Sequence, residues 1–145
     1  MDISALSNWL DNLALSLSPS ERRNLLRILS NGLRTRMRDR IKQQRDPDGF
    51  RFIPRKRDQI GNIRRQGALF QRLGRHMRTK YSANHSAVGF SGRTGFIAKV
   101  HQEGLTQRPK KNANLIAYPK RKTVGFSDDD VKWIEQAILI FLSQK

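Results

Sequence analysis

The side chains that could support catalysis or metal binding are few in this chain, and they are scattered. The histidines His76, His85 and His101 show neither an HxxxH nor an HExxH spacing, and the chain contains no cysteine. His101, in the stretch AKVHQEG, has only Glu103 as an acidic neighbour in sequence and no adjacent nucleophile. We interpret it as a packed or interface histidine. The pattern predicts no catalytic residue, no metal site, no cofactor and therefore no enzyme.

A run of three aspartates, Asp128 to Asp130, follows Ser127 and precedes an apolar stretch. Carboxylates in a first helical turn offset the helix dipole and cap free amides, and the sequence offers no second carboxylate cluster to complete an oxygen cage. The run therefore predicts the start of a C-terminal helix. The glycines of GFSGRTG, residues 89–95, lack the strand–helix context and the distant acidic residue of a dinucleotide site, and we interpret them as a turn.

Positive charge is the strongest compositional feature of the chain. The formal net charge of the 145 residues is +17, and residues 21–80 hold 19 Lys/Arg against 5 Asp/Glu. A block this basic indicates a polyanion or an acidic protein surface as partner. The alternative is a solvated face that only keeps the protein in solution.

A long basic helix is predicted from Pro19 to about Gln44. Ser18, Pro19 and Glu21 supply an N-cap, a proline at the first helical position and a capping-box glutamate. The apolar positions share one face: Leu26, Leu29, Leu33, Met37 and Ile41. Arginines at spacings of four and seven residues form a stripe beside that face: Arg23, Arg27, Arg34, Arg38 and Arg45. The stripe is either a contact surface for phosphates or carboxylates, or a row of solvated arginines whose stems cover apolar surface.

A basic segment follows this helix. Asp46-Pro47-Asp48-Gly49 predicts a turn, because proline cannot continue the helix and glycine supplies a positive φ. Residues 50–63 interleave aromatic and basic side chains, whose rings either stack on nucleic-acid bases or, in the interpretation we favour, anchor the loop to the core. Further candidate contacts to DNA or an acidic partner lie here: Arg55, Lys56, Arg57, Arg64 and Arg65.

The pattern as a whole predicts an α+β fold: N-terminal helices, one of them long and basic, a small antiparallel sheet, and a C-terminal helix packed on the sheet. Ile3, Leu6, Leu10 and Leu13 recur at helical spacing and predict a short amphipathic helix over about 3–15. The later elements are a short helix over 66–75, hairpin strands at 77–83 and 88–90, a helical turn at 97–101, a polar loop at 107–114, a strand at 115–118, and a helix from Ser127 with an apolar face of Val131, Ile134, Ile138, Phe141 and Leu142.

The length suits one domain, residues 1–145. Within it we expect a helical N-terminal arm at 1–45, a basic loop at 46–66 and an α+β core at 67–145.

Three pieces of the chain resemble one known family. The first follows the long basic helix and consists of Gln44, Asp46, Pro47, Asp48, Gly49, Phe52 and Pro54. The other two are an HQ-x-G piece, His101, Gln102 and Gly104, and a YP-x-R piece, Tyr118, Pro119 and Arg121. In this order they resemble the phage virion morphogenesis, or tail completion, proteins of P2-like contractile-tailed bacteriophages, over most of the chain. The chain departs from the family at Glu103, where the family often has an aromatic residue.

The resemblance implies a non-enzymatic structural protein that completes the phage tail and stabilises its joining to the head at the neck. It also implies a homo-oligomeric ring matching the tail's symmetry. The implied partners are the tail tube, tail terminator or neck and connector proteins, with the packaged DNA in the channel as a further candidate. The HQ-x-G and YP-x-R residues would be subunit-interface or family-signature positions. The expected location is the virion, after assembly in the host bacterial cytoplasm and without a membrane stage, since no apolar run is long enough to cross a bilayer. The alternative is a free-standing basic nucleic-acid-binding protein.

Overall fold

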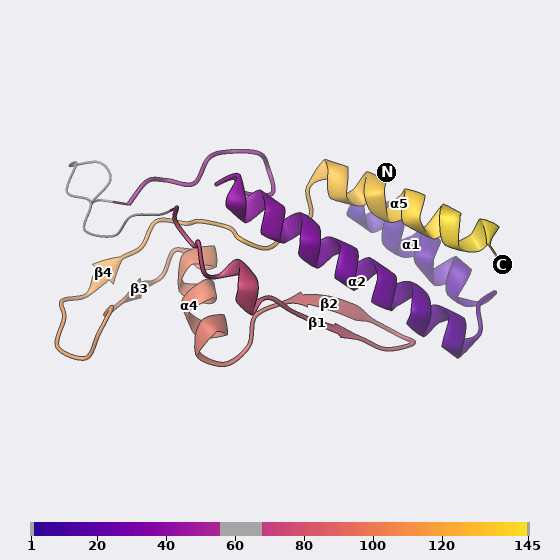
Figure 1. Ribbon diagram of the computed structural model, residues 1–145, viewed down its shortest axis with the longest axis horizontal. Helices are drawn as coiled ribbons and strands as arrows, with labels where there is room; N and C mark the ends of the chain where they lie inside the picture. The colour runs from indigo at the N-terminus through magenta and orange to yellow at the C-terminus, as the bar shows by residue number, and fades with distance from the viewer. Residues whose placement is uncertain (1, 56–67, 145) are drawn as a thin grey trace. The chain divides into compact units, whose positions relative to one another are not determined.

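The computed structural model describes residues 2–55 and 68–144 of the chain (Figure 1). They group into two compact units. The first contains residues 1–36, 78–88 and 126–145, and the second contains residues 37–77 and 89–125. Helices and short strands occur together, so the predicted α+β class is confirmed, and the C-terminal helix lies in the first unit with a β-hairpin.

Helix starts in the first unit follow the predicted capping chemistry. The helices are α1 (Ile3–Ala14), α2 (Pro19–Lys42), which continues into the second unit, and α5 (Asp128–Ser143). At α2, Ser18 Oγ accepts a hydrogen bond from Glu21 N and Glu21 Oε1 accepts one from Ser18 N. At α5, Ser127 and Asp130 form the same reciprocal pair. Within the described residues, no helix combines the length and the apolarity that a membrane crossing requires.

The buried face of α2 differs by one residue from the predicted face. Its buried side chains recur every four residues: Leu25, Leu29, Leu33, Met37 and Ile41. Leu26 was predicted on this face but is only half-buried. Its carbonyl oxygen accepts a hydrogen bond from Ser86 Oγ, so the main chain at this position faces the hairpin.

α5 packs on α2 through both apolar and polar contacts. Val131, Ile134 and Ile138 are buried, as predicted, whereas the predicted face residues Phe141 and Leu142 are only half-buried. The indole of Trp133 lies directly against Gly32, where any Cβ would overlap the ring. The guanidinium of Arg36 lies over the same indole, 5.8 Å from the ring centroid, and its Nε donates to Asp130 Oδ1 at 2.7 Å.

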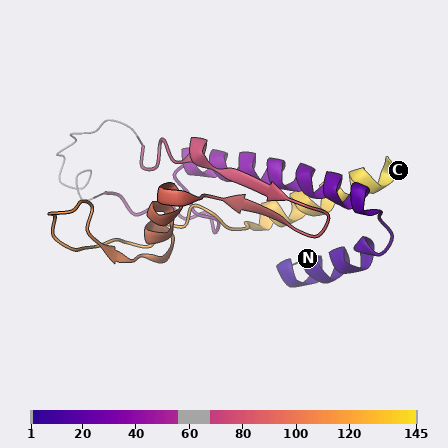
Figure 2. The ribbon, with the colours of Figure 1, turned by 90° about the horizontal axis from the view of Figure 1, so that it is seen from below.

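The hairpin of the first unit consists of β1 (Arg78–Tyr81) and β2 (Ser86–Gly89), close to the two predicted strands. Ser82 N donates to His85 O and closes the connecting turn. The hairpin runs along α2 (Figure 2). Arg22 Nε donates to Ala83 O at 3.1 Å and, with the bond from Ser86 to Leu26, fixes the hairpin to the helix.

The second unit is built around α4 (Gly92–Glu103), which is longer than the single helical turn predicted at 97–101. Glycines at 92 and 95 weakened the sequence signal for this helix, because glycine is a poor helix former. Gly95 is required by packing, since a Cβ there would lie 3.1 Å from Phe90 O. Gly92 and Gly95 therefore belong to α4, and Gly89 is the last residue of β2, which corrects the interpretation of GFSGRTG as a turn.

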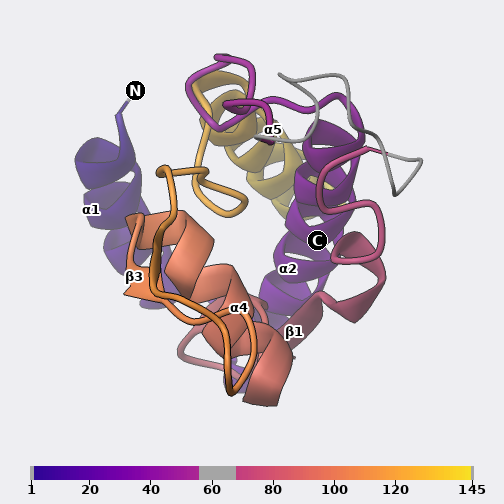
Figure 3. The ribbon, with the colours of Figure 1, turned by 90° about the vertical axis from the view of Figure 1, so that its left-hand side faces the viewer.

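Two other elements of this unit differ in the structure from what the sequence predicted. In the described part of the predicted helix 66–75, the chain forms turns and a single 3₁₀ turn, Gly74–His76, because Phe70 has a φ of +62° that ends any helix. The predicted strand at 115–118 is β4 (Ile116–Ala117), and it pairs antiparallel with β3 (Thr106–Gln107) at the start of the predicted polar loop. Figure 3 shows this second hairpin beside α4.

The ion pair between Arg36 and Asp130 gives the first stability prediction. Asp130 is 1 % exposed, and its Oδ2 also accepts the Ser127 main-chain N–H. We expect Asp130→Asn to lower the free energy of unfolding by about 1–3 kcal/mol, because the amide removes the charge that faces the half-buried Arg36 and leaves one acceptor oxygen for two donors. Asp129→Asn, at an exposed position of the same helical turn, should cost far less. Urea denaturation of the two variants measures the difference, and equal losses would contradict the assignment.

Candidate functional site

The predicted HQ-x-G and YP-x-R positions lie together in the second unit, where α4 ends and the β3–β4 hairpin returns. Gln102 joins these two segments through its side chain. Its Oε1 accepts hydrogen bonds from Thr123 N at 2.8 Å and Val124 N at 3.2 Å, and its Nε2 donates to Val124 O at 2.9 Å. A primary amide is required for this pattern because it donates and accepts at once.

Gly104 ends α4 in the left-handed conformation, with φ of +65°. A Cβ at this position would lie 3.2 Å from Lys120 N and 3.3 Å from Tyr118 O. Glycine is therefore required here twice, for its backbone conformation and for the close approach of the returning strand.

His101 lies in a row of edge-to-face ring contacts. Phe52 contacts Phe70, Phe70 contacts His101, and His101 contacts Tyr118, with ring centroids 5.5, 4.9 and 5.0 Å apart. The Nδ1 atom of His101 is buried and has no hydrogen-bond partner among the described residues. Burial, and to a smaller extent the positive charge of Arg121, lowers the pKa of His101 below its ordinary value of 6.5. The ring is thus a neutral packing group, which agrees with its interpretation as a packed histidine.

Arg121 connects this group to the first piece of the family pattern. The side chain is buried, with 5 % exposure, and its Nε donates to Ile53 O at 2.7 Å and its Nη2 to Pro54 O at 3.1 Å. Its main-chain N–H donates to His101 O at 2.7 Å. One arginine therefore holds the segment that contains Phe52 and Pro54 against the end of α4.

The Gln44–Pro54 segment is held by hydrogen bonds to Leu69 and by hydrogen bonds within its own turn. Gln44 exchanges hydrogen bonds with Leu69, its Nε2 donating to Leu69 O at 2.8 Å and its Oε1 accepting from Leu69 N at 3.1 Å. Asp46 Oδ1 accepts from the main-chain N–H groups of Asp48 and Phe50. Phe52 is buried, so the interpretation of this aromatic as a core anchor is confirmed, while Phe50 is 71 % exposed.

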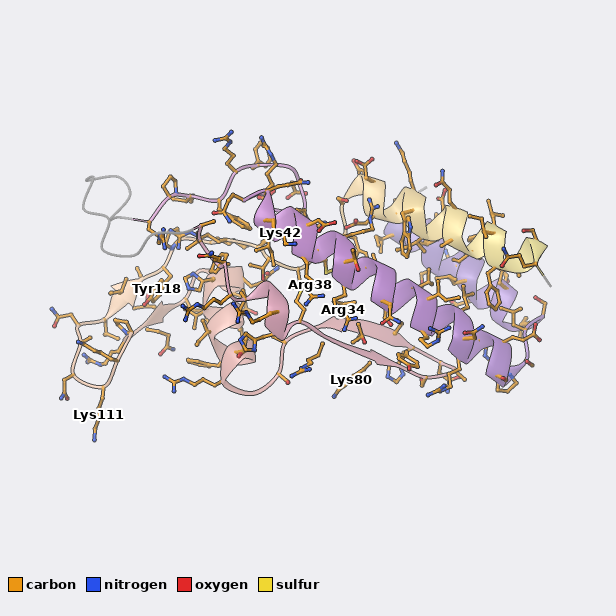
Figure 4. The ribbon with its side chains drawn as sticks, viewed as in Figure 1. Arg34, Arg38, Lys42, Lys80, Lys111 and Tyr118 are labelled. Carbon is orange, nitrogen blue, oxygen red and sulfur yellow. The ribbon has the colours of Figure 1, made fainter. Side chains whose placement is uncertain are left out.

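The arginine stripe of α2 is largely engaged within the chain. Arg23 lies over the Tyr81 ring at 5.0 Å, Arg27 donates to Asn24, Arg38 donates to Gly74 O, and Arg45 donates to Gly49 O. Arg34 is half-buried, and its Nε is buried with no partner in the described part of the chain. Figure 4 shows Arg34 and Arg38 on one side of α2. Contact of the stripe with DNA or an acidic partner stays a prediction.

The other predicted contact residues are placed only in part. Arg55 is half-buried, and Lys56, Arg57, Arg64 and Arg65 lie outside the described residues. Sequence reasoning missed a different basic element, the β3–β4 hairpin. Its signal was the absence of any Asp or Glu between Glu103 and Asp128.

The arrangement is one of packing and main-chain hydrogen bonding rather than of reacting groups. Within residues 2–55 and 68–144, no three His, Cys, Asp or Glu side chains come close enough together to hold a metal ion. Of the predicted signature positions, Gln102, Gly104 and Arg121 each have a defined structural task, and His101 and Tyr118 stack. Pro119 is half-buried beside them.

Comparison with known proteins gives one consistent result. A model of the phage virion morphogenesis family matches residues 1–143. The chain is also similar to tail completion protein S of Escherichia phage P2, with 34 % identity over 142 residues, which is 93 % of this chain and 93 % of that protein. No solved structure matches.

The two demands on Gly104 can be separated by a pair of variants. Gly92 has a similar φ of +60°, but a Cβ there would meet nothing within 4 Å. We expect Gly92→Ala to cost about 1–2 kcal/mol through backbone strain alone. Gly104→Ala should cost about 1–3 kcal/mol more, because the methyl group also crowds Lys120 and Tyr118. Chemical denaturation of both variants tests this, and an equal cost would mean that the close approach is unimportant.

The lowered pKa of His101 predicts a loss of stability in mild acid. Below about pH 6.5 the unfolded chain takes up a proton at this residue while the folded chain does not, so the free energy of unfolding falls as the pH decreases toward the lowered pKa. We expect His101→Phe, which keeps a ring in the stack, to flatten this pH dependence. The exposed His76, changed to Gln, should leave it in place. Thermal unfolding between pH 7.5 and pH 5 measures both.

Proposed function

The chain belongs to the phage virion morphogenesis family, and from this premise we propose that it is a structural protein of a phage tail that completes the tail and stabilises its joining to the head. The single observation that carries the proposal is the role of the family-like residues in the second unit. They hold main-chain segments of the second unit together through hydrogen bonds. The similar phage P2 protein is named for tail completion and matches over almost its whole length.

We further propose that the chain acts as a subunit of a ring. On α4, Ala98 and Val100 are buried, whereas the neighbouring Phe96 and Ile97 are 54 % and 44 % exposed. Adjacent large apolar side chains that stay exposed are typical of an interaction surface. The exposed pair on α4 is therefore the proposed contact between neighbouring subunits.

Other tail or neck proteins are the proposed further partners, with the virion as the site of action. In the first unit, Leu139 and Ile140 of α5 are 56 % and 58 % exposed and offer a second apolar surface. A free-standing nucleic-acid-binding protein, the alternative suggested by the charge, would need neither exposed pair.

The ring proposal predicts that Phe96→Ser/Ile97→Ser weakens self-association. Loss of two buried apolar side chains should lower the affinity at least about tenfold, on the scale of 1.5–3 kcal/mol for each side chain. Sedimentation of the purified chain, alone and with tails that lack it, measures the effect. Lys99→Ala, an exposed change on the same helix, is the matched control.

Infectivity provides the functional readout. Tails assembled without the chain should join heads when wild-type protein or the Lys99→Ala variant is added, and should fail to do so with the double variant. A wild-type chain that stays monomeric while it restores joining would overturn the ring. A chain that never restores joining would overturn the tail function.

A further inference from the structure

The two units differ sharply in charge. The first unit has nine Lys/Arg and seven Asp/Glu, a net of +2, and the second has 20 Lys/Arg and five Asp/Glu, a net of +15. The basic character of the chain is therefore a property of the second unit. This division does not follow the sequence block 21–80, because the hairpin β1–β2 and most of α2 belong to the nearly neutral unit.

The most uniformly basic part of the second unit is the segment 105–122, which contains β3, β4 and their connecting loop and is named here the cationic hairpin. It has six Lys/Arg and no Asp or Glu. Neither strand contains a buried residue, and Lys110 and Lys111 are exposed at the turn. Figure 4 shows Lys111 at the tip, pointing away from α4.

The base and the tip of the cationic hairpin are both held in place. At the base, Tyr118 N donates to Leu105 O and Arg121 is buried. At the tip, Arg108 Nη1 donates to Ala113 O at 2.7 Å, and Ala113 N donates to Lys110 O. Two-residue strands with no apolar face of their own are marginal in water. The hydrogen bonds at its base and tip therefore order a hairpin that its short strands alone would not hold.

We propose that the cationic hairpin binds the phosphate backbone of duplex DNA, independently of base sequence. A two-stranded β-ribbon is one of the two elements that the major groove of B-DNA admits. Lysine supplies the compact point charge suited to phosphate oxygens. Single-stranded nucleic acid fits less well because it needs stacking surfaces, and the one aromatic ring of the hairpin, Tyr118, is half-buried against His101.

An acidic protein surface is the less favoured occupant. Protein interfaces are depleted in lysine and place apolar or aromatic groups at their centre. The tip of the cationic hairpin offers Lys110 and Lys111. Leu115, at 60 % exposure, is the one large apolar side chain exposed on the hairpin.

The test removes three charges from the hairpin and compares the result with three removed elsewhere. The hairpin variant is Lys110→Gln/Lys111→Gln/Lys120→Gln, which leaves the structural Arg108 and Arg121 intact. The control variant is Arg78→Gln/Lys80→Gln/Lys132→Gln, at exposed positions of the first unit. Both lower the net charge equally, and equal melting temperatures show that both are folded.

Binding of the purified chain to labelled duplexes of two unrelated sequences is measured by fluorescence anisotropy over a range of salt concentrations. We expect the wild-type chain to bind both duplexes equally well. The plot of log affinity against log salt concentration should become shallower by up to about three units in the hairpin variant and should change little in the control. The proposal is overturned by an absence of wild-type binding at low salt, by equal loss in the two variants, or by equally tight binding of a single strand. It is also overturned if the hairpin variant binds DNA normally but no longer joins tails, which would assign the lysines to an acidic protein. Because the assay uses the chain alone, its outcome is independent of the ring and of tail completion.

Discussion

The second unit depends on side chains that satisfy main-chain groups which no regular ladder satisfies. Among its described residues, the unit has one α-helix of its own, one 3₁₀ turn and two strands of two residues, so most of that backbone lies in loops. Gln102 and Arg121 bond the main chain of segments 21 to 68 residues away. Unpaired buried main-chain groups are costly, and these few polar side chains are therefore what makes an irregular unit compact. The family resemblance at these positions follows from that need.

How much of the fold could be predicted from the sequence depended on how far apart in the chain the interacting residues lie. The caps at Ser18 and Ser127 act over three residues, and the sequence predicted both. α4 was underestimated because its local signal contains two glycines, one of which is there for contact with Phe90. The bond pair between Gln44 and Leu69 spans 25 residues and gave no local pattern at all. The same holds for Phe70, whose positive φ is imposed by its surroundings and not by its residue type.

The candidate site shows the same division. The family-like positions lie together in the second unit, but their spatial relation required the structure, because Arg121 bonds Ile53 and Pro54, which are 68 and 67 residues away in the chain. The arginine stripe was predicted as one helical pattern, but Arg45 lies beyond the end of α2, and among the described residues four of the five arginines have partners. Arginine stems and guanidinium groups readily serve neighbouring carbonyls, so spacing alone could not distinguish structural arginines from exposed ones. Further exposed charge lies on lysines of the β3–β4 hairpin, of which the sequence predicted β4 but not the two-residue β3.

The order in which the two units appear in the chain has a consequence for biosynthesis. The first unit needs residues from 1–36, from 78–88 and from 126–145, whereas the second is complete once residue 125 has been made. Domains fold as they emerge from the ribosome, N-terminal parts first. α2 must therefore wait for α5, with the partners Arg36 and Asp130 separated by 94 residues. The residues of the second unit thus become available before α5, and the face of α2 that packs on α5 stays uncovered until α5 has been made.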